Sequence, residues 1–194
     1  MTRLEHVMNV SEAIRTKRAL RDFSKQPLPE KDVRAILNAG RRAQSSKNRQ
    51  AWAFLAVQER ETLKKLSRFG AFAGHLSGAA LGVLILTPPP EKFYGALFDA
   101  GQAAAYMQLA AWELGVGSCL ATLYKAEKAY ELLGIPEEWQ VLMAISFGYP
   151  AQRSGLHFKP LKGGRKPLDE VVHWERWGNH ATTAADGSRP RKAK

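Results

Sequence analysis

The chain has 194 residues, of which 45% are hydrophobic and 24% charged, a composition typical of a globular domain with a sizeable core. Its formal net charge of +11 favours anionic partners such as nucleic acid, a membrane surface or a phosphate-bearing ligand. The single cysteine, Cys119, excludes an internal disulfide framework and a cluster of thiolate metal ligands. The N-terminus lacks a signal-peptide pattern, and the longest apolar run, 78–86, is too short to span a bilayer. We therefore expect a cytoplasmic protein without a membrane partner.

The first half of the chain alternates helical and strand-like patterns. Asn9 followed by Glu12 resembles a capping box, which predicts a helix directly after it. Apolar side chains then recur with helical spacing, and two short apolar runs have the length of buried strands. The expected elements are helices over 11–20, 30–43 and 61–69, and strands over 52–57 and 80–86.

The second half is organised around an alanine-rich helix, which we place at the centre because its small side chains allow close approach. Gly115 and Gly134 suit the ends of this helix and of the next one. The expected elements are helices over 98–115 and 125–134, a strand or extended loop over 116–123, and a strand over 140–148. Helices interleaved with few strands predict an α/β or α+β fold around a buried sheet.

We expect one domain over residues 1–178 and a separate tail over 179–194. Beyond Pro150 the chain first resembles a loop and then returns to apolar and aromatic residues at 168–178. The tail has four basic residues, one acidic residue and no large apolar residue, so we expect it to be disordered. Most of the positive charge therefore belongs to the folded domain.

Two basic segments are candidate anion sites. The first holds Arg15, Lys17, Arg18 and Arg21. Cations this close repel one another, which favours an anionic partner, while a solvated basic helix face is the alternative interpretation. In the second segment, 159–167, Gly163 and Gly164 would let the backbone approach a phosphate closely, and Arg165 could bind it through two hydrogen bonds.

The sequence contains no motif for a metal site or an activated nucleophile. The histidines show neither H-x-x-x-H nor H-E-x-x-H spacing, no serine lies in a G-x-S-x-G elbow, and both common glycine-rich nucleotide loops are missing. Cys119 lies in an apolar stretch and is interpreted as a buried, inert thiol. If the chain is an enzyme, a bound organic cofactor should carry the reaction. The polar stretch before Trp52 is either an ordinary turn or the lining of a ligand site.

Four segments, taken in order, resemble the FMN-dependent nitroreductase family over about residues 11–177. They are KRALRDF (17–23), AQSSKNRQAW (43–52), LGVGSCLATL with LLGIPEEWQVLMAISFGYP (114–123 and 132–150), and RKPLDEVVHWE (165–175). The resemblance implies an α+β fold with a mainly antiparallel central sheet flanked by helices. It also implies an intertwined homodimer with FMN bound at the subunit interface.

The resemblance assigns the cations of the flavin site. Lys17, Arg18 and Arg21 would surround the cofactor, with Lys17 and Arg165 at its phosphate and Arg21 near the pyrimidine edge of the ring. Ala19 occupies the family's serine position in this cofactor-binding segment.

The remaining cofactor contacts would come from polar groups. The resemblance implies that Ser45, Ser46 and Asn48 reach the flavin bound to the other subunit. Thr122 and the backbone of Leu123 would lie at flavin N5, which Thr122 would tune. No side chain is expected to act as a catalytic acid or base, since N5 carries the hydride.

Three positions depart from the family pattern: Ala19, Gln44 and Ala51. Ala19 removes a hydroxyl from the phosphate site, and the other two replace prolines, so the loop that holds them should be less rigid. The expected result is either a lower affinity for FMN or compensation by Arg15 or Lys162.

The implied activity is hydride transfer from NAD(P)H to flavin N5, then reduction of a flat acceptor such as a nitroaromatic or quinone in a ping-pong cycle. Some relatives instead dehalogenate a substrate, cleave flavin or oxidise a bound substrate. A lid often selects such substrates. Here the segment 87–98 either offers Phe93, Tyr94 and Phe98 for stacking on a substrate or is a plain proline-rich connection.

The non-enzymatic alternative is a basic nucleic-acid-binding protein. No recognition motif accompanies the charge, so we expect only nonspecific binding through the tail.

Overall fold

The computed structural model describes residues 8–152 and 164–180, which belong to two compact units with a boundary between Phe158 and Lys159. The first unit contains the sheet and most helices, and the second contains one short helix, α7 (Leu168–Val171). No helix in the described part of the chain is both long and apolar enough to cross a membrane.

The core of the first unit is a four-stranded sheet in the order β1-β2-β4-β3. Every neighbouring pair is antiparallel, with Leu84 opposite Ala144 and Cys119 opposite Ser146 in the register. The strands are β1 (Ala53–Val57), β2 (Leu81–Thr87), β3 (Gly117–Ala121) and β4 (Gln140–Gly148). Every residue of β2 is buried, as its continuous apolar sequence predicts.

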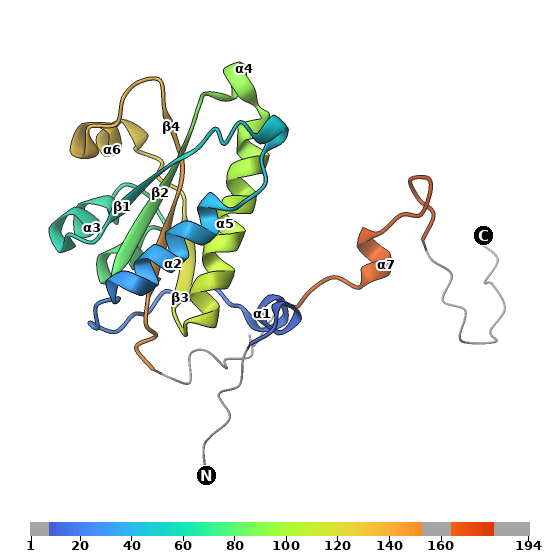
Figure 1. The fold of residues 1–194 in the computed structure, drawn as a ribbon, viewed down its shortest axis with the longest axis horizontal. Coiled ribbons are helices and arrows are strands. Elements are labelled where there is room, and N and C mark those ends of the chain that lie inside the picture. Colours follow the sequence, from blue (N-terminus) through green and yellow to red (C-terminus); the bar gives the residue numbers. More distant parts are fainter. Residues whose placement is uncertain (1–7, 153–163, 181–194) are drawn as a thin grey trace, which may run out of the picture. The chain divides into compact units, whose positions relative to one another are not determined.

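Helices lie on both faces of this sheet (Figure 1). They are α1 (Val10–Thr16), α2 (Glu30–Arg41), α3 (Arg60–Leu66), α4 (Pro90–Phe93), α5 (Gly95–Glu113) and α6 (Ala126–Leu133), with the short 3-10 helices η1 (Ser46–Asn48) and η2 (Gly74–Gly78). The antiparallel sheet with its flanking helices confirms the predicted α+β class.

Alternating side chains of the strands build a separate core on each face. Val83 and Ile85 pack with α2 and α5, whereas Leu84 and Leu86 pack with α3, η2 and α6. Helix α2 crosses α5 (Figure 1) at a point where a Cβ on Gly40 would lie 2.2 Å from Cε of Met107. The close approach therefore depends on glycine as well as on the small residues of α5.

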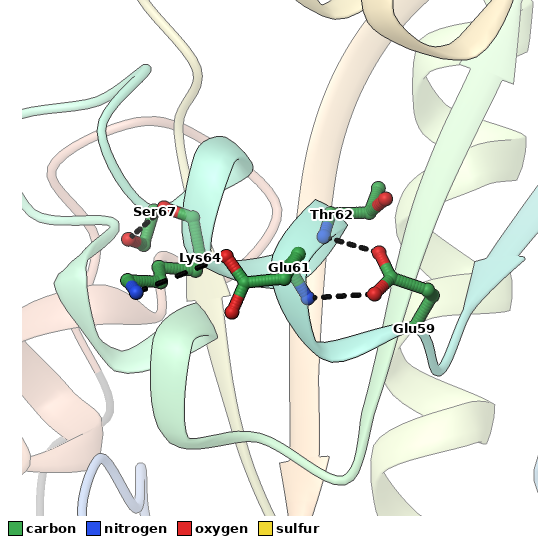
Figure 2. Close-up of polar contacts among 5 residues, drawn as sticks. All are labelled: Glu59, Glu61, Thr62, Lys64 and Ser67. Atoms are coloured by element: carbon green, nitrogen blue, oxygen red, sulfur yellow. Dashed lines mark hydrogen bonds and ion pairs between the residues drawn. The ribbon is translucent and has the colours of Figure 1, made fainter.

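Helix α3 begins at a side-chain cap, which Figure 2 shows. The Glu59 carboxylate accepts hydrogen bonds from the backbone N–H groups of Glu61, at 2.9 Å, and Thr62, at 2.5 Å. The hydrogen bonds with Thr62 and Glu61 hold the pKa of Glu59 below its usual value. At the other end, Ser67 Oγ donates to the Lys64 carbonyl at 2.8 Å, so local contacts define both ends of this surface helix.

The prediction of a helix over 11–20 is wrong in its second half. The Asn9 side chain caps α1 as predicted, accepting from the Glu12 N–H at 2.9 Å, but the helix ends at Thr16. Lys17 follows with φ −53° and ψ 132°, and the chain then runs beside β3. Pairing with a strand, which the local pattern does not encode, replaces the last helical turn.

Candidate functional site

The segment 17–21, called the cationic segment below, is held against the edge of the sheet by its backbone. Ala19 forms a parallel bridge with Ser118 of β3, and the N–H of Leu20 donates to the Ser118 carbonyl at 3.0 Å. A Cβ on Gly117 would lie 2.7 Å from Cδ1 of Leu20 and 2.8 Å from its Cβ. Glycine at 117 therefore allows the segment to lie directly on β3.

Two of the three predicted cations of the segment donate hydrogen bonds to other groups of the chain. Lys17 Nζ donates to Oε1 of Gln108 on α5. Arg18 Nη1 donates to the carbonyls of Arg15 and Lys17, at 2.9 and 2.8 Å. Since these carbonyls lie at the end of α1, Arg18 satisfies acceptors that the helix leaves open.

Arg21 is exposed, and its charge acts on groups of the sheet. Burial raises the pKa of the Cys119 thiol, while the charges of Arg21 and Lys17 oppose that shift. In the ranges that the structure describes, neither Arg18 nor Arg21 forms an ion pair with a carboxylate. Cys119 is 3% exposed, so its expected character as a buried thiol with little thiolate is consistent with the structure.

His75, Ser146 and the Cys119 carbonyl form a buried polar cluster that the sequence did not predict. Nδ1 of His75 and Oγ of Ser146 are 2.7 Å apart, and Ser146 Oγ donates to the Cys119 carbonyl at 3.3 Å. Burial lowers the pKa of His75, the Arg21 charge lowers it further, and the Leu120 carbonyl opposes both effects. The three residues come from η2, β4 and β3, so no spacing in the sequence could have linked them.

Ser118, the strand partner of Ala19, carries a second unusual polar group. Its hydroxyl is buried and has no hydrogen-bond partner among the described residues. The residue lies beside the position at which Ala19 lacks the family's hydroxyl. A buried hydroxyl without a partner is unfavourable, so this position is a candidate for a contact that the chain alone does not supply.

The residues 45–50, called the polar turn below, have a strained backbone. Lys47, Asn48 and Gln50 have φ values of 53°, 53° and 50°, in the left-handed region that side chains disfavour. Within the turn, the Gln50 N–H donates to Ser45 Oγ at 3.0 Å, and Gln50 Nε2 donates to Asn48 Oδ1 at 3.1 Å. Most of its side chains, including those of Ser46 and Asn48, are exposed.

Contacts with α4 and α5 hold the polar turn from outside. The Ser46 N–H donates to Oδ2 of Asp99 at 3.0 Å, and the Arg49 guanidinium lies 4.6 Å from the centre of the Phe93 ring. No hydrogen bond within the described ranges joins the polar turn to the cationic segment. Within the described part of one chain, these two predicted parts of the site are therefore not joined by hydrogen bonds.

Thr122 and Leu123 follow β3 directly. Thr122 is exposed and Leu123 buried, and a Cβ on Gly70 would lie 2.0 Å from the Thr122 carbonyl oxygen. The Lys125 N–H donates to the Phe69 carbonyl at 3.0 Å. The backbone after β3 is thus fixed by the loop that follows α3.

An apolar cavity of about 190 Å³ lies between the sheet and α5. It is lined by Ile85, Ala100, Gly101, Ala104, Ala105, Gln108, Leu120 and Met143. Gln108 also accepts the hydrogen bond from Lys17, so the cavity and the cationic segment share a residue. Leu120 is 42% exposed, which leaves an apolar surface beside the cations.

Arg165 belongs to the second unit, where it is exposed and precedes α7. Two further residues of the predicted phosphate site, Lys162 and Gly163, lie outside the described residues, as does the tail from residue 181. Within the described ranges, no three His, Cys, Asp or Glu side chains gather as a metal site.

Comparisons with known proteins agree with this fold. The model of the nitroreductase family matches residues 14–71 and 73–149. A relative from Archaeoglobus fulgidus, whose name proposes an NADH dehydrogenase/NAD(P)H nitroreductase, is 31% identical over 171 residues, covering 84% of this chain and 96% of the relative. The FMN reductase (NADPH) of Bacillus subtilis is 26% identical over 189 residues, covering 85% of this chain and 73% of that protein.

The solved FMN-dependent nitroreductase of Clostridium difficile R20291 superposes with a TM-score of 0.75 at 27% identity, covering 85% of this chain and 98% of that one. A sheet with this order, flanked on both faces by helices, is therefore the nitroreductase fold. The chain belongs to the nitroreductase family, which confirms the resemblance inferred from its four sequence segments.

Proposed function

We propose that this protein binds FMN and transfers electrons from NAD(P)H to a flat acceptor such as a nitroaromatic or a quinone. It is an FMN-dependent NAD(P)H oxidoreductase, as its family membership indicates. The observation that carries the proposal is the pairing of the cationic segment with β3, where Lys17 donates to Gln108, a residue that also lines the apolar cavity. Cations beside an apolar surface fit a cofactor with a phosphate and a flat ring.

FMN, when bound, supplies the ring that accepts a hydride from NAD(P)H at N5 and returns two electrons to the acceptor. The protein would bind the cofactor and tune its electrostatics. Lys17 would bind the phosphate, while Arg21 would stabilise negative charge at the pyrimidine edge. Thr122 and the backbone of Leu123 would donate hydrogen bonds at N5, and the exposed Leu120 would pack on the ring.

The proposal includes a homodimer with the cofactor between subunits. The exposed Ser46 and Asn48 have no hydrogen bond to the cationic segment of their own chain, which supports a role at the site of the other subunit. Helix α5 and the residue that follows it also expose apolar side chains: Phe98 by 75%, Tyr106 by 41% and Leu114 by 36%. Such residues along a central helix favour burial against a second copy.

The test is FMN binding by wild type and by Lys17→Ala and Arg21→Ala, measured by flavin fluorescence in equilibrium titrations. Loss of a charged hydrogen-bond partner should weaken binding about tenfold to hundredfold. Lys31→Ala removes an exposed cation from α2 and should leave the affinity within about twofold. A wild-type protein that takes up no FMN contradicts the proposal, and so do variants that bind as well as the Lys31 control.

A specialised flavin reaction is the second candidate, favoured by the exposed aromatic residues of 90–98. Tyr94 is 81% exposed and Phe98 75% exposed, so this stretch can stack on a substrate. Anaerobic addition of NADH or NADPH separates the candidates. Bleaching of the bound flavin by either nucleotide supports the NAD(P)H reductase, and a flavin that neither nucleotide bleaches supports the specialised reaction.

For nucleic acid, we propose only nonspecific binding through the tail. Deletion of 179–194 should abolish any retention of DNA by the protein at low salt. Retention by the shortened chain would assign the binding to the folded domain instead.

A further inference from the structure

Asp99 is a buried carboxylate outside the residues assigned to the cofactor. It lies in the second turn of α5 and is 4% exposed, yet its Oδ2 accepts the Ser46 N–H at 3.0 Å. Burying a carboxylate costs free energy unless it accepts hydrogen bonds. Asp99 and Ser46 are 53 positions apart in the sequence, so the carboxylate connects two distant segments.

The polar turn needs such an external contact because of its backbone. Most side-chain-bearing residues lose about 1–2 kcal/mol in the left-handed region. Lys47 and Gln50 of this turn adopt it, together with Asn48, a residue type that tolerates it better. The side-chain hydrogen bonds within the turn are exposed to solvent, where water competes with them. Its backbone adds two bonds, from the N–H of Asn48 to the Ser45 carbonyl at 2.9 Å and from the N–H of Arg49 to the Ser46 carbonyl at 3.1 Å. These bonds alone leave the strained conformation weakly determined.

A second contact joins the same turn to the end of α4. Arg49 lies over the face of Phe93, 4.6 Å from the ring centre, within the range of a cation–π interaction. Phe93 and Asp99 lie six positions apart, at the α4–α5 junction. One short stretch of chain therefore holds the polar turn through a partly buried hydrogen bond and through a half-buried aromatic ring.

We propose that Asp99 is the positioning residue of the polar turn, and that the Arg49–Phe93 contact couples this turn to the aromatic stretch 93–98. Asp99 fixes the backbone of Ser46 and so the directions of the Ser45, Ser46 and Asn48 side chains. The consequence for FMN rests on the proposed function, whereas the anchoring of the turn does not.

Limited trypsin digestion tests the anchoring without cofactor, because the exposed Lys47 and Arg49 are cleavage sites inside the turn. Asp99→Ala should speed cleavage after these two residues about tenfold, the effect expected for a partly buried N–H that loses a charged acceptor. Asp99→Asn keeps an oxygen acceptor and should stay within about threefold of wild type. Glu113→Ala removes an exposed carboxylate from the same helix and serves as the matched control.

Ser46→Pro removes the donor of the same hydrogen bond and keeps the test decisive if Asp99→Ala fails to fold. Ser45 has ψ 149°, which is compatible with a following proline. Cleavage should rise about as much as in Asp99→Ala, and the double variant should be no faster than either single one. Equal cleavage in wild type and in Ser46→Pro, or independent effects of the two substitutions, would overturn the proposal.

Phe93→Leu tests the coupling to the aromatic stretch, because it keeps apolar bulk and removes the ring face. Cleavage after Arg49 should rise about threefold, and an unchanged rate would show that Phe93 does not help to hold the polar turn.

In the FMN titration, Asp99→Ala should weaken binding about tenfold, and Asp99→Asn should restore it. If wild type binds no FMN, the proposed function fails while the digestion still decides the anchoring. If wild type binds FMN and Asp99→Ala binds it equally, the positioning role fails alone.

Discussion

The cationic segment and the polar turn are expected to serve the same cofactor, yet the fold holds them in different ways. The backbone of the first forms a bridge and a hydrogen bond to β3. The second combines backbone hydrogen bonds within the turn with bonds to the side chains of Ser45 and Asp99. Side chains of the cationic segment can therefore vary without moving its backbone, which explains how Ala19 replaces the family's serine. In the polar turn, a change of side chain also changes the backbone.

Gly117→Val should have the largest effect on stability, because its side chain would disrupt the packing of the cationic segment on β3. The new Cβ would lie within 2.8 Å of two Leu20 carbons, including its Cβ, so backbone as well as side chain must move. We expect a loss of about 3 kcal/mol in the free energy of unfolding, measured by urea denaturation. Gly74→Ala, at a site with open space for a Cβ, should be close to wild type. Equal stability of both variants would contradict the close packing.

Thr16→Val should have the next largest effect, because it loosens the end of α1, where the cationic segment begins. The buried Trp112 indole donates to Thr16 Oγ1 at 2.9 Å, and this hydroxyl donates to the Glu12 carbonyl at 2.7 Å. Loss of the hydroxyl should lower the free energy of unfolding by about 1.5 kcal/mol. Thr16→Ser keeps the oxygen and is the matched control. A valine variant as stable as the serine variant would show that this bond contributes nothing.

Substitutions of Lys47 test the strain in the polar turn. Its φ of 53° is compatible with glycine and strongly unfavourable for a β-branched side chain. Lys47→Val should therefore be less stable than Lys47→Gly by about 1 kcal/mol, as measured by thermal unfolding with calorimetry. The opposite order of stability would mean that the residue does not adopt the left-handed conformation in solution.

The smallest effect concerns His75, the buried neighbour of the cationic segment. Burial and the Arg21 charge lower its pKa below the usual 6.5, so the unfolded chain binds a proton that the folded chain releases. This contribution to stability is complete above pH 6.5 and is lost as the pH falls from there through the folded pKa. Urea denaturation from pH 7.5 downward should show a shallower decline for His75→Gln than for wild type. His173→Gln, in the second unit, is the control, and an identical decline in wild type and His75→Gln would contradict the assignment.

The comparison of the two segments also shows which parts of the site the sequence could predict. The motifs singled out Lys17, Arg21 and the polar turn as candidates, because these residues lie in short contiguous segments. They did not reveal Asp99 or His75, which act through partners 53 and 71 positions away. An acidic residue in an alanine-rich helix and a histidine in a loop carry no local sign of burial.

The sequence by itself determined the strands, most of the helices and the family, since apolar periodicity, caps and contiguous motifs are local properties. Gly115 and Gly134 were predicted to end α5 and α6, and both have positive φ, at 72° and 63°. Only the tertiary structure decided that α1 stops at Thr16, that Gly117 must lack a side chain, and that Asp99 supports the polar turn. Each of these depends on a contact between segments distant in the chain, and the energy of such a contact is absent from any local pattern.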